Sequence, residues 1–451
     1  MALGPMVVID LIGQAFRKPL KALLPPQIDT TQLGVVHRMI TSFGSNATAD
    51  SWLGMQRALA MAHGPNGDRL YEQLFFGDTL RFQYPMSSLL PIEALSHLGI
   101  ATFEQLNSLN TVLFFLNGLA VGWLAWLLIP SPARDSRANR LALAALAGVL
   151  SYAFYPLMRG LVLGQIQIWI DLLFTGALIA WTLRRHGLAG VLIGLACTIK
   201  PQLALLLVWG LLWREWRFAL GLVVTAGSLE LVSLAAYGWH DQAAYLGVLS
   251  FLSRHGESFA PNNSVNGILN WYLSGQDSLF WYKHAFPPFN PIVYGGTLAA
   301  TLIFVGVMLS QPLLARARKA DLADLGVAAI CTIVASPVAW DHHYGLLMPL
   351  FVVAVCSLPR ESAAARAWVR PACLFVAWTL TACFIPFVFF LAHSPLAFVQ
   401  AYILFGGLIL LGVLSTTRLG VPVAAAASGP VQLAPVSTRA WSPGRGTGTA
   451  N

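Results

Sequence analysis

A small number of charged and titratable side chains lie beside the long apolar stretches of this chain. Lys200 stands in the middle of one such stretch, and His342 and His343 lie at the start of another. Charge inside a membrane is costly, so each of these residues is a functional candidate. Asp50 precedes an amphipathic stretch and is placed to act as a general base, and a cation such as Lys200 can bind a phosphate or a sugar hydroxyl.

Each of these residues also has a purely structural interpretation. A lysine such as Lys200 can extend from a helix end to the membrane interface, and Asp50 can cap the helix that follows it. His342 and His343 diverge by roughly 100° on a helix, so one can reach a cavity while the other packs. With Asp341 they could bind a metal, but no complementary ligand cluster accompanies them.

Polar side chains gather in two further places. An amide-rich run, Asn262-Asn263-Ser264-Val265-Asn266-Gly267, follows Arg254. Amides serve turns through bonds to the backbone, and they also hydrogen-bond sugar hydroxyls. Arg159 and Gln165 belong to a short polar turn before an apolar helix, where Arg159 is the lone cation. Both places are therefore candidates for substrate contact.

The composition predicts that a membrane surrounds these residues. Hydrophobic residues make up 57% of the 451 positions and charged residues 10%, whereas a soluble domain has roughly 25% charged residues. The net charge of +8 comes from basic residues at helix ends rather than on one face, which argues against nucleic acid as a partner. The five cysteines lie in apolar runs without metal spacing and are expected to be core residues.

The apolar runs predict an all-α bundle of about ten to twelve membrane helices, because a spanning helix needs roughly 20 apolar residues. The clear candidates are 104–129, 139–157, 161–183, 216–238, 291–313, 343–358, 371–391 and 397–416, and the shorter or interrupted ones are 85–99, 188–199, 201–213 and 321–337. We expect an N-terminal segment at 1–103, the bundle at 104–416 and a disordered cytoplasmic tail at 417–451.

Arginine and lysine in short turns predict the orientation of a multi-pass protein in the cell membrane. The basic turns contain Arg134, Arg137, Arg140, Arg184, Arg185, Arg214, Arg217, Arg316, Arg318, Lys319, Arg360, Arg366 and Arg370, and they should be cytoplasmic. The turns at 158–165 and 336–343 and the loop at 239–290 are then extracytoplasmic. Because basic turns bound 188–213 on both sides, this segment should form two half-length helices with Lys200 at their outer turn.

The first 84 residues are too polar to span a membrane. Residues 52–62 have a helical period, so we expect an extracytoplasmic loop with surface helices. A spanning helix should precede this loop, although residues 1–45 contain only weak candidates.

Four motifs in this order resemble glycosyltransferase family 87, whose members are GT-C-type membrane enzymes that include mannosyltransferases. They are Gly164-Gln165, the segment Gly190 to Lys200-Pro201, Asn262-Asn263-Ser264-Val265, and Ser336-Pro337-Val338-Ala339-Trp340-Asp341-His342-His343. Such families begin with an aspartate shortly before a helix and a Tyr-Pro-Pro turn. Asp50 and Tyr84-Pro85 occupy those places, and Met86 replaces the second proline. The resemblance covers roughly residues 50–420.

The resemblance implies transfer of a hexose, often mannose, from a polyprenyl-phosphate donor to an extracytoplasmic glycolipid or glycan acceptor. Asp50 would be the base of an inverting reaction, and Lys200, Arg159, His342 and His343 would bind the donor phosphate. The residues expected to contact substrate are Tyr84, Gln165, Asn262, Asn263 and Arg254. No cofactor is implied, and lysine and arginine can neutralise the phosphate without a metal.

Two other classes of protein remain open. A transporter or lipid flippase also has broken helices and intramembrane polar residues, but the spacing of the motifs contains no inverted repeat. A catalytically inert assembly or scaffold subunit is the third alternative, since acceptor-binding residues are not recognisable.

Overall fold

The computed structural model describes residues 3–15, 24, 48–65, 67–78, 80–129, 137–315, 318–358 and 368–417. This part of the chain is helical, and its one extended pairing is an isolated bridge between Asn262 and Trp340. The predicted all-α membrane bundle is therefore confirmed. Most of residues 1–45 and the predicted tail from 418 onward lie outside the described residues. Helix α1 (Leu3–Ala15) has 13 residues, fewer than the roughly 20 that a crossing requires.

Among the described residues, four helical segments are long and apolar enough to cross a membrane. They are α6 (Phe103–Leu128), α12 (Trp216–Tyr237), α15 (Pro291–Leu314) and the segment 397–415, which ends in α19 (Tyr402–Ser415). Side-chain caps fix where the first and third begin. The Thr102 hydroxyl accepts the Gln105 amide in a capping box before α6, and Asn290 caps α15.

The other apolar helices are short or broken. They are α9 (Gln167–Thr182), α10 (His186–Cys197), the segment 201–212 with α11 (Leu205–Leu212), α16 (Leu322–Val334), the segment 341–356 with α17 (Leu347–Cys356), and α18 (Val369–Ala382). The sequence predicts this for 188–199, 201–213 and 321–337, whereas 161–183, 343–358 and 371–391 were expected to be full-length helices. The break between α10 and α11 lies at Lys200-Pro201, where Lys200 is extended, because a residue before proline avoids the helical region.

Three predicted boundaries were wrong, and proline explains two of them. The run 139–157 is divided into α7 (Arg137–Ala153) and α8 (Tyr155–Leu163), bent by 50°, and Pro156 opens α8 in its first turn. Arg159 therefore lies on a helix rather than in a turn. The run 371–391 stops being α-helical at Ala382, and Pro386 opens a separate 3-10 turn.

The third difference is that the predicted loop 239–290 contains two helices, α13 (Trp239–His255) and α14 (Val265–Leu273). The other membrane helices can be recognised in the sequence by their high mean hydropathy. Helix α13 begins with Trp-His-Asp-Gln and is too polar to give that signal.

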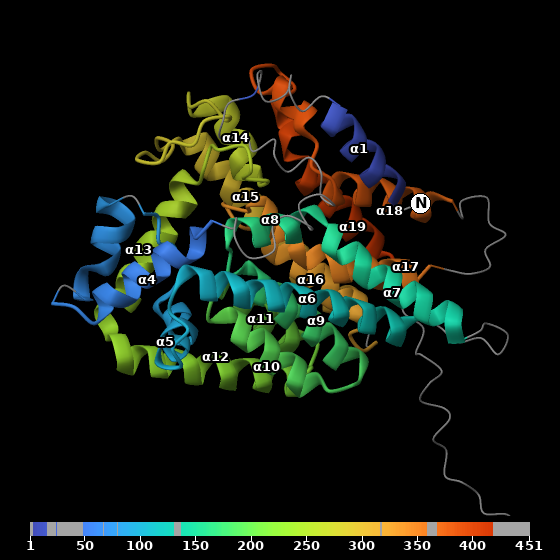
Figure 1. Cartoon of the computed structure of the whole chain (residues 1–451), viewed down its shortest axis with the longest axis horizontal. Coiled ribbons are helices and arrows are strands. Elements are labelled where there is room, and N and C mark those ends of the chain that lie inside the picture. The colour runs from blue at the N-terminus through green and yellow to red at the C-terminus, as the bar shows by residue number, and fades with distance from the viewer. Residues whose placement is uncertain are drawn as a thin grey trace, which may run out of the picture. The chain divides into compact units, whose positions relative to one another are not determined.

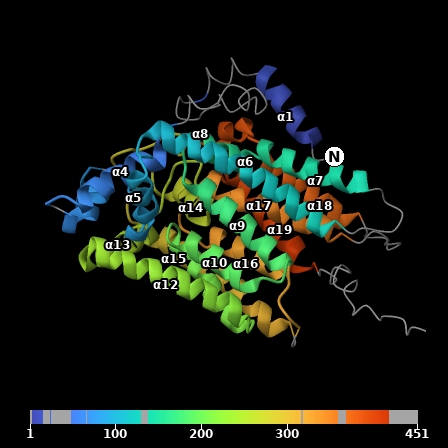
Figure 2. The same ribbon diagram turned by 60° about the horizontal axis from the view of Figure 1, so that its bottom comes forward.

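Helices α6, α9, α10 and α12 form a row in which each packs against the next (Figures 1 and 2). Glycine permits the closest of these approaches. A Cβ on Gly190 of α10 would overlap the Phe218 carbonyl oxygen of α12, and one on Gly221 of α12 would overlap the Gly187 carbonyl oxygen. Small residues at such contacts let helix backbones approach in a membrane, where dispersion rather than the hydrophobic effect drives packing.

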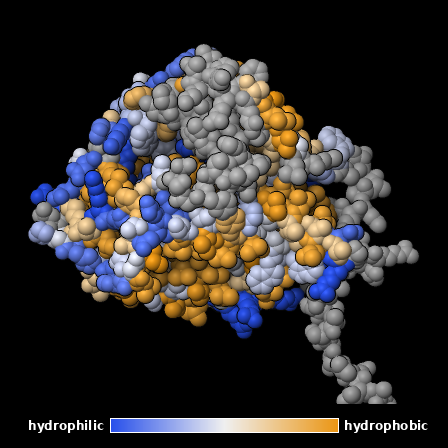
Figure 3. All heavy atoms as spheres, viewed as in Figure 1, coloured by the Kyte–Doolittle hydropathy of each residue, from blue (hydrophilic) through white to orange (hydrophobic). Residues whose placement is uncertain are grey.

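The surface separates into an apolar flank and a polar end. Figure 3 shows hydrophobic residues over the flank of the bundle and hydrophilic residues gathered where α4 (Asp50–Ala62), α5 (Leu89–His97) and α13 lie. Leu119, Leu231 and Leu302 on three of the long helices are each more than 60% exposed. A row of exposed leucines on membrane-length helices is what lipid contact requires.

Candidate functional site

Asp50 is the first residue of α4 and is exposed. The cap interpretation of this residue was wrong, because Ala49 occupies the N-cap and no side chain caps the helix. The Asp50 carboxylate instead accepts a hydrogen bond from the side-chain amide of Gln165. A carboxylate in the first turn also interacts favourably with the helix dipole. The polar end of the molecule thus presents an accessible carboxylate held by one amide.

Gln165 is itself held by groups from three elements. Its Oε1 accepts hydrogen bonds from the Ser51 hydroxyl at 2.7 Å and the Tyr84 hydroxyl at 3.3 Å. Its carbonyl oxygen accepts the side-chain amide of Asn110 on α6 at 3.0 Å. Burial raises the pKa of the Tyr84 phenol, so this hydroxyl remains a donor at neutral pH. The side chains of Tyr84, Gln165 and Asp50 are therefore linked by hydrogen bonds.

Gly164 makes this meeting possible. It adopts a left-handed conformation with φ of +64°, which suits a residue without Cβ. A Cβ there would overlap the Thr48 carbonyl oxygen. The Thr48 amide and hydroxyl donate to the carbonyls of Val162 and Leu163 at 3.0 and 2.9 Å, so the chain before α4 is fastened to the end of α8.

Asp341 joins two of the predicted cations and was not itself predicted as a site residue. Its Oδ2 lies 3.4 Å from Arg159 Nε and accepts the Tyr155 hydroxyl at 2.7 Å. Its Oδ1 accepts the His342 backbone amide at 2.8 Å and lies 3.4 Å from His342 Nδ1. A carboxylate beside two histidines in a predicted outer turn was the available signal for this residue.

Lys200 lies in the same neighbourhood. Its ammonium donates to Gln167 Oε1 at 2.5 Å, and Gln167 Nε2 donates to Asp171 Oδ1 at 2.8 Å. His342 interacts electrostatically with both Lys200 and Asp50, and His343 interacts with Lys200. The rings of His342 and His343 meet edge to face with centroids 4.7 Å apart. Gln167, which has no charge, gave no sequence signal for its role beside Lys200.

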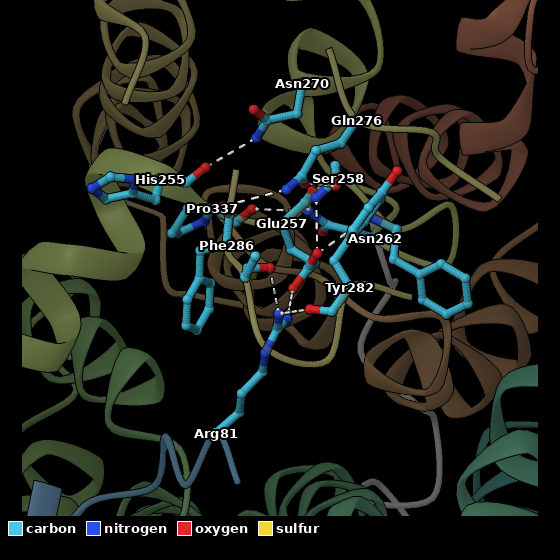
Figure 4. Close-up of polar contacts among 12 residues, drawn as sticks. Arg81, His255, Glu257, Ser258, Asn262, Asn270, Gln276, Tyr282, Phe286 and Pro337 are labelled. Atoms are coloured by element: carbon cyan, nitrogen blue, oxygen red, sulfur yellow. Dashed lines mark hydrogen bonds and ion pairs between the residues drawn. The ribbon is translucent and has the colours of Figure 1, made fainter. Parts of the chain in front are cut away.

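The remaining three predicted residues lie elsewhere. Arg254 is exposed in the last turn of α13. Asn262 and Asn263 are buried, and their side-chain amides donate to backbone carbonyls. Figure 4 shows Asn262 beside Glu257. Contact of Arg254 and Asn263 with substrate stays a prediction. The Asn262 side chain, in contrast, has hydrogen-bond partners within the protein for both of its polar atoms.

A buried ion pair accompanies the amide-rich run. Arg81 and Glu257 form a salt bridge with side chains 9% and 3% exposed, and Figure 4 shows the Arg81 side chain extending to Glu257. Burial raises the pKa of Glu257 and lowers that of Arg81, and their mutual attraction opposes both shifts. This pair could not be predicted from the sequence, because the two residues are 176 positions apart.

The described residues contain no group of three or more histidine, cysteine, aspartate or glutamate side chains able to hold a metal ion. What they do bring together is one accessible carboxylate and four candidate cationic or titratable groups: Lys200, Arg159, His342 and His343. A base beside cations is able to deprotonate a hydroxyl and stabilise a departing anion.

Comparison with known families gives one match. The model of glycosyltransferase family 87 matches residues 82–337, more than half of the 451-residue chain. The matched region contains Arg159, Gln165 and Lys200, and it ends before His342. No curated protein matches the chain.

Proposed function

This chain belongs to glycosyltransferase family 87, and on that premise we propose that it moves a hexose, in the simplest case mannose, from a polyprenyl-phosphate donor to an extracytoplasmic glycolipid or glycan. The chain is a membrane glycosyltransferase by its family and its apolar helices. The single observation that supports the proposed chemistry is the accessible Asp50 carboxylate, held by Gln165 and interacting with His342 in the Lys200 neighbourhood.

In the proposed reaction Asp50 takes the proton of an acceptor hydroxyl. The acceptor oxygen attacks the anomeric carbon in line with the bond to phosphate, and that bond breaks as its electron pair moves to the phosphate oxygen. The products are an inverted glycoside and a polyprenyl phosphate. Gln165 aims the carboxylate, and the hydroxyls of Ser51 and Tyr84 hold Gln165. A base must lie within hydrogen-bond reach of the proton it removes, so this aim matters to the rate.

The departing phosphate gains negative charge, and the chain supplies cations to meet it. Lys200 and Arg159 are the proposed partners, with His342 or His343 as a further donor. Asp341 orients Arg159 and His342 through the contacts described above. Preorganised cations stabilise a developing charge without the cost of reorienting solvent. The proposed reaction uses no cofactor.

The proposed donor is a lipid because the polar groups lie next to apolar, lipid-facing helices. A polyprenyl chain can enter such a bundle sideways from the bilayer while its phosphate reaches Lys200. We place the reaction on the extracytoplasmic side of the cell membrane because the arginine-rich turns predict that the opposite side is cytoplasmic.

A lipid flippase is the rival activity. It would move the lipid-linked sugar without forming a glycosidic bond, and it would not need a general base. Glycosyl transfer by detergent-solubilised protein, without a membrane or ion gradient, therefore separates the two activities.

The deciding experiment uses Asp50→Asn in purified protein supplied with a panel of labelled polyprenyl-phosphate sugars and an extract of membrane glycolipids. We expect kcat to fall by roughly 10²- to 10⁴-fold, the usual contribution of general base catalysis. Asp68→Asn is the matched control, because Asp68 is another exposed aspartate of the N-terminal segment. Turnover at the wild-type rate by Asp50→Asn would remove Asp50 as the base, and the labelled product identifies the sugar.

A further inference from the structure

The side chain of Asn262 joins two loops that are far apart in the sequence. Its Nδ2 donates to the Glu257 carbonyl at 2.9 Å and to the Pro337 carbonyl at 3.3 Å. Its Oδ1 accepts the backbone amide of Ala339 at 2.9 Å. Asn262 is 0% exposed, and both polar atoms of this buried amide are bonded within the protein. Figure 4 shows the side chain between Glu257 and its neighbours.

We call residues 337–341 the outer strap. Three further bonds fasten it to the amide-rich run: Asn263 N to Ala339 O at 2.8 Å, Asp341 N to Pro261 O at 3.1 Å, and Ser264 Oγ to Pro337 O at 2.9 Å. The first two of these bonds join backbone groups and form the isolated bridge between Asn262 and Trp340. The strap therefore has its shape fixed by the run 261–264.

The outer strap ends at Asp341, the carboxylate that contacts Arg159, Tyr155 and His342. A shift of the strap would move this carboxylate and with it the two proposed phosphate ligands. Misplacement by about 1 Å is enough to lower an enzymatic rate by roughly 100-fold.

The Arg81–Glu257 pair holds the other side of Asn262. The Glu257 carboxylate accepts the Ser258 amide at 3.0 Å while it binds Arg81. The Arg81 guanidinium also donates to the Ala285 carbonyl at 2.8 Å and lies 4.2 Å from the ring centroids of both Trp281 and Phe286. A guanidinium with this many partners can occupy one position only.

We propose that Asn262 is a positioning residue that holds the outer strap, and that the buried Arg81–Glu257 pair fixes Asn262 in turn. The proposal rests on the proposed function for its effect on rate, and on the geometry alone for its effect on the strap. It replaces the earlier expectation that Asn262 contacts substrate, because this side chain is buried and its polar atoms already have partners.

Hydrogen exchange of the peptide that contains residues 336–344 tests the geometric half. In Asn262→Ala the amide of Ala339 loses its acceptor, and we expect this peptide to exchange at least about tenfold faster, as loss of a buried hydrogen bond predicts. Asn270→Ala is the matched control. Asn270 is equally buried and donates to His255 O and Asn266 Oδ1, with no bond to the strap. Equal exchange in Asn262→Ala and wild type would overturn the proposal.

Steady-state kinetics tests the catalytic half. We expect Asn262→Ala to lower kcat by roughly 10- to 100-fold with the KM for the labelled lipid donor changed by less than about twofold. A raised KM with unchanged kcat would show substrate contact and overturn the positioning role. If the wild-type protein transfers no sugar at all, the proposed function fails, while the exchange result still decides the role of Asn262.

Arg81→Lys provides a milder test in case Asn262→Ala does not fold. A lysine keeps the charge opposite Glu257 and loses the planar fork, so we expect faster strap exchange and lower kcat, both by smaller factors than in Asn262→Ala. Wild-type exchange in Arg81→Lys would remove the ion pair from the proposal.

Discussion

Lys200 is a half-buried cation whose ammonium is oriented by a neutral neighbour. Its ammonium has a neutral partner, Gln167, between it and the carboxylate of Asp171. In a direct ion pair the Asp171 carboxylate would neutralise the Lys200 ammonium. The Gln167 amide between these two groups orients the ammonium and leaves its positive charge able to attract a phosphate. We infer that the amide at position 167 matters as much as the two charges that it separates.

The prediction at this scale concerns Lys200→Ala. Loss of one preorganised charge donor typically lowers the rate by about 10²- to 10³-fold, and we expect kcat/KM for the lipid-linked donor to fall by that order. The measurement is initial rate against donor concentration. Lys283→Ala, which removes an exposed lysine between α14 and α15, should keep wild-type kinetics. Unchanged kcat and KM in Lys200→Ala would exclude a phosphate role.

At the residue scale, charged candidate residues could be chosen from the sequence, whereas the hydrogen bonds between neutral side chains could not be predicted from it. Arg159, Lys200 and the histidine pair could be chosen as candidates because charge is rare in apolar segments, and Asp50 because it precedes an amphipathic stretch. The Ser51, Gln165 and Tyr84 contacts could not be ranked in the same way. Their partners lie 33 to 114 positions away, and neutral polar residues are common at helix ends.

At the scale of elements, the turn between α8 and α9 determines the position of the chain before α4, because Thr48 bonds to the end of α8 and lies against Gly164. Gly164→Ala would place a methyl group against the Thr48 carbonyl in a left-handed backbone. We expect it to lower the free energy of unfolding by about 2–4 kcal/mol, since the left-handed conformation alone costs about 1–2 kcal/mol. Thermal unfolding in detergent measures the change.

Gly99→Ala is the control for that substitution. Gly99 is also left-handed, with φ of +81°, and nothing lies within 4 Å of the Cβ position. It should show the conformational cost alone, about 1–2 kcal/mol. Equal losses in the two variants would mean that the approach of Thr48 to Gly164 adds no constraint.

A second prediction at the element scale concerns the contact of α13 with the 67–69 turn. Asp241 is buried and accepts the Leu70 amide at 3.2 Å, and burial raises the pKa of its carboxyl to about 6. The folded protein therefore binds this proton more tightly than the unfolded chain does, and stability falls as pH rises from about 4 to about 6. Asp241→Asn should flatten this part of the profile of melting temperature against pH. An unchanged slope would show that another group titrates there.

Element boundaries followed from the sequence where proline marks them and failed where polarity hides a helix. The break at Lys200-Pro201 was predicted because basic turns bound the segment 188–213 on both sides and a proline lies at its middle. The break at Phe154 was missed because the apolar run continues across it, and a proline two residues later opens the next helix. Helix α13 was missed because polar residues such as Asp241 and His255 interrupt its apolar pattern, and these side chains bond to neighbouring segments of the chain.

For the whole molecule, the division between an apolar flank and a polar end predicts one orientation in the membrane. Lys283→Cys should react with a membrane-impermeant maleimide on intact cells, because the 239–290 segment is expected outside. Lys319→Cys should react only after the cells are opened. Both positions are exposed, so access to the reagent decides the result. Reversed labelling would place the site on the cytoplasmic side and contradict the proposed donor leaflet.

The overall architecture could be predicted because membrane helices are encoded locally, in about 20 consecutive residues. The assembly of the site could not, since it depends on contacts between helices whose sequences carry no pairing signal. The alternation of basic and bare turns added the one long-range prediction, the side of each turn.

The Arg81–Glu257 pair and the contacts of the outer strap can form only late in the synthesis of the chain, because their partners are far apart in the sequence. Arg81 reaches the membrane early during translation, its partner emerges 176 residues later, and Pro337 follows Asn262 by another 75. Before Glu257 is synthesised, Arg81 of the nascent chain has no carboxylate partner. Before Pro337 is synthesised, the run 261–264 lacks its hydrogen bonds to the outer strap. A ribosome stalled before residue 337 therefore leaves an inserted chain in which Asn262 has no strap to bind, and such a chain is open to recognition by membrane quality-control proteases.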